Sequence, residues 1–370
     1  MKFTCLQENL SKGLSIATKA IPTKSSLPIL SNVLISAEDG QIKLAATNLE
    51  TTIVTYVGAS VEEEGSITVP AKLIKDFISN LSPSTIVANL KDDIMHLSSE
   101  RTKSKFNGTN PMDYPNLPTF SKKLPHMELD PQVFGTAVAN VAFAAATDQA
   151  RPVFTGIFLN YDKGVLTIAS SDGFRLSEKV LKVDSKLPAF SAIIPAKTLL
   201  EVARIFLTSE EPIKFALNAE DNLVLFEAED TLVASQVLSG EYPNYKKIIP
   251  TENIITAEFL AVELLEAVKL TNVFAKEANS AIKMRFDPEG FIHVVSLVQE
   301  TGEHESTMSA VIEGGELEIA FNSRYLLDLL NNVKSERILF LAKGSTSPCL
   351  FKPLEHEDFL HVIAPMQIQG

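Results

Sequence analysis

The sequence predicts an α+β protein made of three consecutive copies of one domain. A short apolar strand that leads into an amphipathic helix occurs three times along the chain. The three copies lie at 67–81, 192–202 and 319–330. Pro70, Pro195 and Asn322 are equivalent positions in them, so the copies are 125 and 127 residues apart. A repeat of that length is a whole domain, because solenoid units are much shorter.

The length and composition of the chain agree with this organisation. A chain of 370 residues gives three domains of about 123 residues each. Hydrophobic residues make up 45% and charged residues 21% of the chain, which is ordinary for a globular protein and excludes a long disordered or collagen-like chain. We expect the domains to cover 1–121, 122–250 and 251–370.

The first domain begins with a strand and a helix. Residues 1–6 alternate as a strand does, whereas 8–20 have helical spacing and Pro22 ends the helix. Short strands and a second helix follow. The strands are expected at 27–36, 42–46, 51–57 and 66–69, the helix at 71–81, and further strands up to Phe106. Residues 110–118 are rich in proline and asparagine, which is typical of a connector.

The second and third domains repeat this order of elements. Asp130 and the proline after it suit the cap and first turn of a helix over 131–147. The connector returns at 241–244, and the third domain starts near Asn253 and carries a helix at 261–276. Each domain therefore combines two helices with many short, mostly antiparallel strands.

The distribution of charge bears on nucleic-acid binding. A formal net charge of −13 is unusual for a protein that grips phosphates. However, many cations lie on or just after predicted helices, while much of the acid lies in predicted loops and strand ends. The helix cations are Lys12, Lys19, Lys24, Lys72, Lys75, Lys197, Arg204, Lys269, Lys276, Arg324 and Lys334. From composition alone, a solvated helix face of mixed charge is the more ordinary interpretation.

The sequence contains no recognisable catalytic or metal-binding motif. The phosphate-binding loop, the dinucleotide glycine motif, the zinc-protease helix motif and the nucleophile elbow are absent. His356 and His361 lack a zinc-ligand spacing, and Cys5 and Cys349 are expected to be buried thiols. We therefore expect no enzyme activity, no cofactor and no metal. No segment resembles a membrane span or a signal peptide, so the cytoplasm is the expected location.

Two stretches have the character of binding surfaces. At 170–177, an Asp-Gly turn presents Phe174, Arg175 and Leu176 in succession, although a simple hairpin turn also explains it. The equivalent segment of the first domain, 48–51, lacks this set of side chains. The apolar C-terminal tail is the second stretch, and its alternative interpretation is a last strand of the third domain.

These features together resemble the family of bacterial sliding clamps, the β subunit of the replicative DNA polymerase. The Asp172–Leu176 turn, the 242–245 connector, the 362–368 tail and the segments 24–32 and 68–71 match that family in order, over the whole chain. The resemblance implies a head-to-tail homodimer that closes a ring around duplex DNA and performs no covalent chemistry. It also implies binding without sequence preference.

The resemblance further implies the partners and the residues that bind them. The partners are double-stranded DNA, the replicative polymerase, the clamp loader, and translesion polymerases and repair proteins that carry short linear peptides. The implied DNA-binding residues are Lys24, Lys72 and Lys197, and the implied dimer contact sets Phe106 against Val273 and Phe274. The implied peptide-binding pocket consists of Phe154, Ser171, Gly173, Phe174, Arg175, Leu176, Pro243, Ile248, Val362, Pro365 and Met366.

The chain departs from the family at several positions that bear on peptide preference. Phe174 stands where some members have histidine, Gln367 and Ile368 stand where Arg-Leu is common, and 369–370 extend beyond the usual end. The loop 148–153 lacks tyrosines that some members place on DNA, so we assign it no role. Apart from the resemblance, a three-domain β-rich scaffold that binds peptides but not DNA is the main alternative. An enzyme with a site between domains is another, and the missing catalytic motif counts against it.

Overall fold

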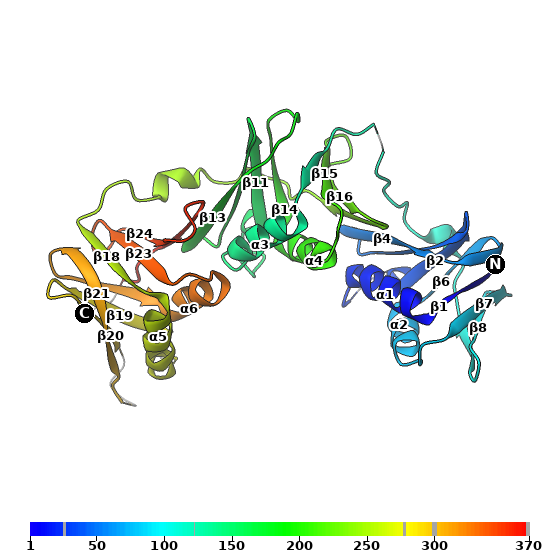
Figure 1. The fold of residues 1–370 in the computed structure, drawn as a ribbon, viewed down its shortest axis with the longest axis horizontal. Coiled ribbons are helices and arrows are strands. Elements are labelled where there is room, and N and C mark those ends of the chain that lie inside the picture. The colour runs from blue at the N-terminus through cyan, green and yellow to red at the C-terminus, as the bar shows by residue number, and fades with distance from the viewer. Residues whose placement is uncertain (25–26, 122, 277–278, 298–301, 368–370) are drawn as a thin grey trace. The chain divides into compact units, whose positions relative to one another are not determined.

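The structure is a computed structural model that describes residues 1–24, 27–121, 123–276, 279–297 and 302–367. It consists of two compact units. The first contains Met1–Gly135, Asp184–Leu187 and Glu201–Val237, and the second contains Thr136–Val183, Pro188–Leu200 and Leu238–Gly370. The middle repeat of the sequence therefore contributes strands to both units (Figure 1). The boundaries expected after residues 121 and 250 stay a prediction.

The first unit contains two antiparallel sheets. The five-stranded sheet has the order β5 (Ser60–Glu63), β1 (Lys2–Leu6), β7 (Thr85–Lys91), β8 (Ile94–Ser98) and β9 (Lys103–Asn107). The eight-stranded sheet has the order β10 (Met127–Leu129), β15 (Ile213–Asn218), β16 (Leu223–Ala228), β17 (Thr231–Gln236), β4 (Thr51–Gly58), β3 (Gln41–Thr47), β2 (Asn32–Glu38) and β6 (Gly65–Pro70). Helices α1 (Gln7–Ala17) and α2 (Ala71–Ser79) contact each other, and α1 packs on β3 and β4.

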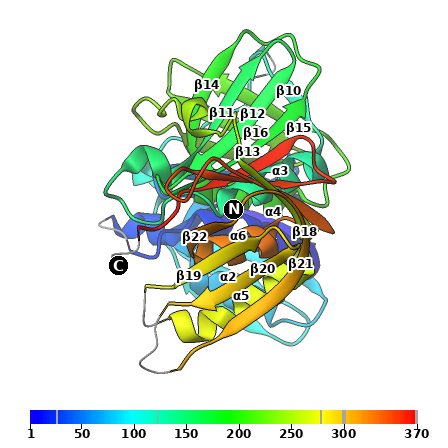
Figure 2. The ribbon, with the colours of Figure 1, turned by 90° about the vertical axis from the view of Figure 1, so that its left-hand side faces the viewer.

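The second unit is organised around one antiparallel sheet of twelve strands. Its order is β14 (Phe190–Pro195), β11 (Gly156–Asp162), β12 (Val165–Ser171), β13 (Arg175–Lys182), β25 (Phe359–Ile363), β24 (Cys349–Pro353), β23 (Arg337–Ala342), β18 (Ile255–Leu260), β21 (Glu305–Gly314), β20 (Phe291–Ser296), β19 (Ala281–Asp287) and β22 (Leu317–Asn322). Helices α5 (Ala261–Ala275) and α6 (Ser323–Asn332) contact each other, and Figure 2 shows β19 to β21 lying over α5. Helices α3 (Pro131–Ala142) and α4 (Ala196–Phe206) each have residues in both units.

The apolar faces of the first two helices are the faces that the structure buries. Leu10 and Leu14 of α1 and Ile74 and Ile78 of α2 are at most 1% exposed, in one core with the surrounding strands. The helical spacing of apolar residues thus decides which side of each helix meets the sheet. The predicted cap is also present, because Asp130 Oδ1 accepts hydrogen bonds from the main-chain N–H groups of the second and third residues of α3, at 3.0 and 2.8 Å.

Three predicted elements differ most from the structure in their bounds. The helix expected at 8–20 is α-helical only to Ala17 and continues as a 3₁₀ turn, η1 (Thr18–Ala20). The strand expected at 27–36 begins instead with the 3₁₀ turn η2 (Pro28–Ser31), where proline sets the first helical φ. The helix expected to reach 147 ends at Ala142, because the Val141 carbonyl accepts hydrogen bonds from the Ser170 hydroxyl and the Ala144 N–H.

The cysteines and histidines are placed as structural residues. Cys5 and Cys349 are buried free thiols, and burial raises the pKa of each to about 12. No group of histidine, cysteine or carboxylate side chains suited to a metal ion occurs among the residues that the structure describes. In that same part of the chain, no helix has the length and apolar character needed to cross a membrane.

Candidate functional site

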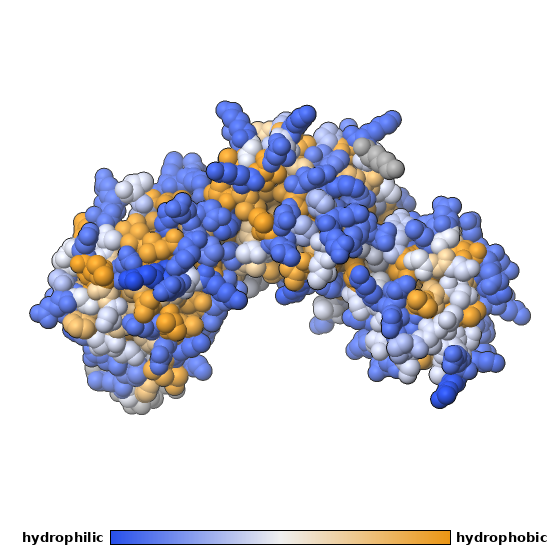
Figure 3. All heavy atoms as spheres, viewed as in Figure 1, coloured by the Kyte–Doolittle hydropathy of each residue, from blue (hydrophilic) through white to orange (hydrophobic). Residues whose placement is uncertain are grey.

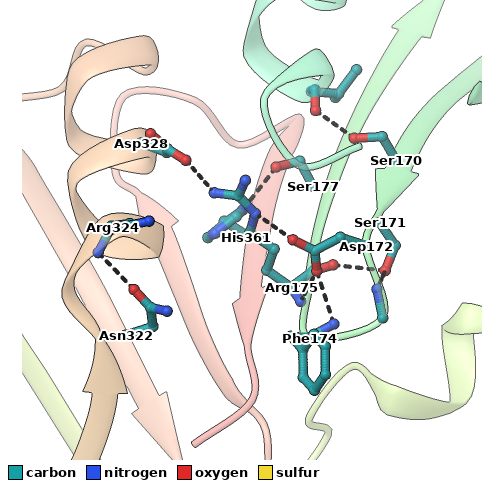
Figure 4. Close-up of polar contacts among 12 residues, drawn as sticks. Ser170, Ser171, Asp172, Phe174, Arg175, Ser177, Asn322, Arg324, Asp328 and His361 are labelled. Carbon is teal, nitrogen blue, oxygen red and sulfur yellow. Dashed lines mark hydrogen bonds and ion pairs between the residues drawn. The ribbon is translucent and has the colours of Figure 1, made fainter. Parts of the chain in front are cut away.

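The turn between β12 and β13 is fixed by local hydrogen bonds. Asp172 Oδ1 accepts the N–H groups of Phe174 and Arg175 at 2.9 and 3.0 Å. The Ser171 hydroxyl donates to the Arg175 carbonyl at 2.7 Å and accepts the Gly173 N–H at 3.0 Å. Gly173 has φ +93°, which favours glycine. The turn therefore holds Phe174, 60% exposed, at its tip (Figure 4).

Arg175 is held from several sides and does not point freely into solvent. Its Nε lies 3.0 Å from Asp172 Oδ2, and its Nη1 lies 2.5 Å from Asp328 Oδ2 on α6 (Figure 4). Its guanidinium also lies 4.6 Å from the centre of the Tyr325 ring. Arg175 thus connects the turn to α6, a contact between residues 153 positions apart in sequence.

The C-terminal tail is a strand as far as Ile363 and then lies beside the turn. Strand β25 pairs with β13, with Leu176 opposite Val362. Beyond the strand, the Ala364 N–H donates to the Phe174 carbonyl and the Met366 N–H donates to the Ala320 carbonyl, both at 2.8 Å. The interpretation of the tail as a last strand is therefore right as far as Ile363, whereas its role as a binding surface stays a prediction. The departure at Gln367 lies within the structure, while Ile368 and the two residues after it lie outside the described residues.

His361 on β25 forms a buried hydrogen bond with β13. It is fully buried, and its Nδ1 is hydrogen-bonded to the Ser177 hydroxyl at 2.7 Å. Burial, and to a smaller degree the charge of Arg175, lower its pKa to about 3. A neutral His361 is therefore part of the scaffold beneath the turn.

These elements surround a cavity of about 300 Å³ in the second unit. Its walls are mainly apolar and aromatic, and Figure 3 shows apolar side chains gathered on the surface near β11 and β13. Its lining residues are Arg151, Phe154, Ser171, Gly173, Phe174, Arg175, Tyr242, Pro243, Asn244, Tyr245, Ile248, Pro348, Val362 and Ala364. A concave, mostly apolar site with a few polar groups suits an extended peptide with apolar anchors.

Most of the side chains predicted for the pocket meet at this cavity. Eight of the eleven line it, whereas Leu176 is fully buried behind the wall, and Pro365 and Met366 lie in the half-buried tail beside it. Sequence reasoning missed Arg151, Tyr242 and Pro348, among others. The connector motif carried a signal for Tyr242, but nothing in the sequence relates Arg151 or Pro348 to this place.

The connector is tied to the sheet by a buried carboxylate. Glu178 on β13, 5% exposed, accepts hydrogen bonds from the Tyr245 hydroxyl and from Lys246 Nζ, both at 2.5 Å. Burial, and then the hydrogen bond with Glu178, raise the pKa of Tyr245. Glu178 thereby fixes the 3₁₀ turn η5 (Tyr245–Ile248), which supplies two residues of the cavity wall.

The predicted DNA-binding lysines all lie on the surface. Lys24 is exposed after η1, and Lys72 and Lys197 are exposed at the second positions of α2 and α4. Arg324 occupies the same position in α6 and is exposed too. A cation near a helix N-terminus is unfavourable toward the helix dipole, so helix stability does not explain these three positions.

The predicted dimer residues differ in accessibility. Phe106 on β9 is 3% exposed and packs against Phe77, with ring centres 5.3 Å apart. β9 is an edge strand of the five-stranded sheet, so its open side exposes backbone rather than this ring. Val273 is 64% exposed on α5, and Phe274 beside it stacks on His304 with ring centres 5.5 Å apart.

Comparison with known proteins gives one family over nearly the whole chain. Residues 1–118, 128–244 and 246–367 match models of the N-terminal, central and C-terminal domains of the DNA polymerase III beta subunit. A beta sliding clamp of Synechococcus elongatus is 29% identical, with both chains fully covered. A DNA polymerase III beta subunit from Thermotoga maritima, 27% identical with both chains fully covered, superposes with a TM-score of 0.93. A sliding clamp of Pseudomonas aeruginosa bound to griselimycin is 26% identical with both chains fully covered, with a TM-score of 0.92.

Proposed function

The chain belongs to the DNA polymerase III beta subunit family, and from that premise we propose that it is a DNA sliding clamp, a homodimeric ring that encircles duplex DNA and tethers the replicative polymerase. The observation that carries the proposal within this structure is the recurrence of an exposed cation at the second position of α2, α4 and α6. In this ring Lys24, Lys72 and Lys197 contact phosphates, so binding does not depend on base sequence. The acidic net charge is compatible with sliding, because a closed ring stays on DNA without a strong electrostatic grip.

The direct test of function is the length of DNA that the polymerase makes in one binding event. A primed single-stranded circle is replicated by the polymerase core with the clamp loader and ATP, with a trap that captures any released polymerase. We expect products of thousands of nucleotides, roughly a hundredfold longer than without the protein. Products of equal length with and without it would favour the DNA-free peptide-binding scaffold.

The cavity of about 300 Å³ is proposed as the site where polymerases, the clamp loader and repair proteins dock through short peptides. The apolar lining supports this, as does the similarity to a clamp solved with griselimycin. The eleven predicted residues remain the proposed site, with Pro365 and Met366 in the half-buried tail beside the cavity.

Truncation of the tail tests this assignment. Met366→Ala, or deletion of the residues from Pro365 onward, is expected to raise the dissociation constant of a fluorescent polymerase peptide about tenfold, because one side of the groove is removed. Met112→Ala, at an 88% exposed methionine of the first unit, is the matched control. Sedimentation should show an unchanged dimer, and an unchanged peptide affinity would contradict the assignment.

The ring is proposed to close by head-to-tail contact between the first repeat of one chain and the third repeat of the other. The open edge of β9, which carries Phe106, would meet α5 with Val273 and Phe274 of the partner subunit. A heterologous contact of this kind forms a closed ring only if its rotation returns after two copies. We also propose that the protein acts without catalysis or cofactor, in the cytoplasm, as expected of a bacterial replication clamp.

A further inference from the structure

The first and second repeats each end in a connector that contains the motif Tyr-Pro-Asn. The motif begins at Tyr114 in the first connector and at Tyr242 in the second, so these two residues are equivalent. The hydroxyl of Tyr114 donates a hydrogen bond to the Ala45 carbonyl at 3.2 Å, which holds the first connector on its sheet. Within the described residues, the buried hydroxyl of Tyr242 forms no such bond. The second connector is therefore held in another way.

The anchor of the second connector is the buried carboxylate of Glu178. It accepts hydrogen bonds from the hydroxyl of Tyr245, three residues after Tyr242, and from Lys246 Nζ, both at 2.5 Å. The ammonium group of Lys246, whose side chain is exposed, also lies 5.3 Å from the centre of the Tyr245 ring. One carboxylate thus fixes two successive residues of η5.

The strand pairing identifies the residue that occupies the position of Glu178 in the first repeat. Glu178 on β13 lies opposite Leu360 on β25, and Val54 on β4 lies opposite Leu232 on β17. On its other side each of them lies opposite an alanine, of β12 and of β3 respectively. Val54 is 3% exposed and belongs to an apolar cluster with Tyr114. The fold therefore accepts an apolar side chain at this position.

The polar residues of the second connector are not explained by the stability of the sheet. A buried carboxylate loses its hydration, and an apolar side chain of similar volume is often as stabilising as a buried ion pair. In the first connector, Leu117 stands in place of Tyr245 and Pro118 in place of Lys246, so neither hydrogen-bond donor is present there. The carboxylate and both of its donors thus occur together in the second repeat, where the first repeat has three apolar residues.

The change of anchor coincides with a change in what the connector exposes. In the first unit, Phe120 is partly buried against the apolar cluster beneath the connector. Ile248, the counterpart of Phe120, is 46% exposed and lines the cavity of about 300 Å³. The two residues before Tyr245, Pro243 and Asn244, line the cavity as well. The connector that is anchored through Tyr245 therefore forms a wall of the cavity.

We propose that Glu178 is a positioning residue for peptide binding, which keeps the cavity open by anchoring the connector through Tyr245. The proposal rests on the peptide site proposed above and identifies what distinguishes this junction between repeats from the junction in the first unit. Glu178 acts through η5, which carries Tyr245 and Ile248 of the cavity wall. Without the carboxylate, the connector packs onto the sheet as its counterpart does, and the cavity becomes narrower.

Substitutions at the anchor test the proposal on the full-length chain. The dissociation constant of a fluorescent polymerase peptide is measured by fluorescence anisotropy. Glu178→Val, which introduces the residue of the first repeat, is expected to raise the constant at least tenfold. Glu178→Gln is expected to stay within about threefold of the wild type, because its amide oxygen still accepts the hydrogen bond from the Tyr245 hydroxyl.

A double-mutant cycle shows whether Glu178 acts through Tyr245. Tyr245→Phe removes the hydroxyl but keeps the ring in the cavity wall, and it is expected to raise the dissociation constant by a factor similar to that of Glu178→Val. Adding Glu178→Val to Tyr245→Phe should then raise the constant less than threefold further, because the anchoring hydrogen bond is already lost. Effects that multiply in the double variant would overturn the positioning role.

The controls separate positioning from general loss of stability and from failure of the peptide site. Val54→Ala truncates the equivalent buried residue of the first repeat, so it should lower the free energy of unfolding and leave peptide affinity unchanged. Urea unfolding shows whether Glu178→Val is folded, and if it is not, Tyr245→Phe decides in its place. Wild-type peptide affinity in the deciding variant overturns the inference while the peptide site stands. A wild-type chain that does not bind the peptide overturns the site and this inference with it.

Discussion

The cavity places two requirements on position 173 that only glycine meets. Its φ of +93° is costly for a residue with a side chain, and an added Cβ would lie 2.7 Å from Nη2 of Arg151. Arg151 is itself held there, because its Nη2 donates to the Asp172 carbonyl at 2.8 Å and its guanidinium lies over the Phe154 ring. The position of Arg151 in the cavity wall therefore depends on the absence of a side chain at residue 173.

Gly173→Ala is predicted to weaken peptide binding more than it weakens the fold. Backbone strain should cost about 1–2 kcal/mol of stability, and displacement of Arg151 should lower peptide affinity about tenfold. Gly164→Ala is the matched control, since Gly164 has φ +84° but its added Cβ would be 3.6 Å from the nearest atom. Calorimetry and a peptide titration of both variants check this. Equal peptide affinities in the two variants would show that Arg151 does not matter.

His361 predicts a particular dependence of stability on pH. Its pKa is about 3 in the folded chain, against about 6.5 when unfolded, so between these values the unfolded chain binds a proton that the folded chain does not. Stability contributed by this residue is complete above about pH 6.5 and is lost as the pH falls toward 3, by up to roughly 1.4 kcal/mol per pH unit. His361→Asn should show a flatter loss between pH 6.5 and 4 in urea unfolding. Parallel curves for the two proteins would mean that His361 is not buried as a neutral ring.

At the residue scale, the sequence predicts what local hydrogen bonds determine. The Asp172-Gly173 turn could be identified because its bonds join residues two to four positions apart. The contact of Arg175 with Asp328 could not, because it joins residues 153 positions apart and depends on how α6 packs. For the same reason, sequence reasoning could not predict that Arg151 and Pro348 line the cavity.

At the scale of single elements, the proposed DNA binding depends on the first residues of α2, α4 and α6. Lys72, Lys197 and Arg324 occupy the second helical position in spite of the unfavourable helix dipole. The sequence predicted these strand-to-helix segments well, since apolar strands run directly into helices with one apolar face. It placed the end of α3 five residues too late, because the Ser170 hydroxyl that bonds to the Val141 carbonyl comes from a distant strand.

Reversal of the helix-start charges is predicted to weaken DNA binding without opening the ring. In a Lys72→Glu, Lys197→Glu chain, the slope of log affinity for duplex DNA against log salt should fall by about 0.9 for each phosphate that the protein no longer neutralises. Lys163→Glu, at an exposed turn between β11 and β12, is the charge-matched control. Sedimentation should show an intact dimer for both. A slope unchanged from that of the control would contradict the role of these lysines.

For the whole molecule, the central claim is that topology, rather than affinity, keeps the protein on DNA. The threefold repeat and the class of fold followed from the sequence because each repeat carries its own strand-helix pattern. The proposed ring closure could not be predicted from periodicity, since it would depend on a surface that a second copy completes. The acidic net charge of −13 fits a protein that is retained without a strong electrostatic grip on the phosphates.

Retention on circular and linear DNA tests that claim most directly. The protein is loaded by its clamp loader onto a nicked circle, freed of loosely bound protein by gel filtration in high salt, and divided into two samples, of which one is cut once with a restriction enzyme. We predict that the protein remains on the circle with a half-life of many minutes and leaves the cut DNA at least tenfold faster, by sliding off its ends. Equal retention on the circle and on the cut DNA would contradict the ring.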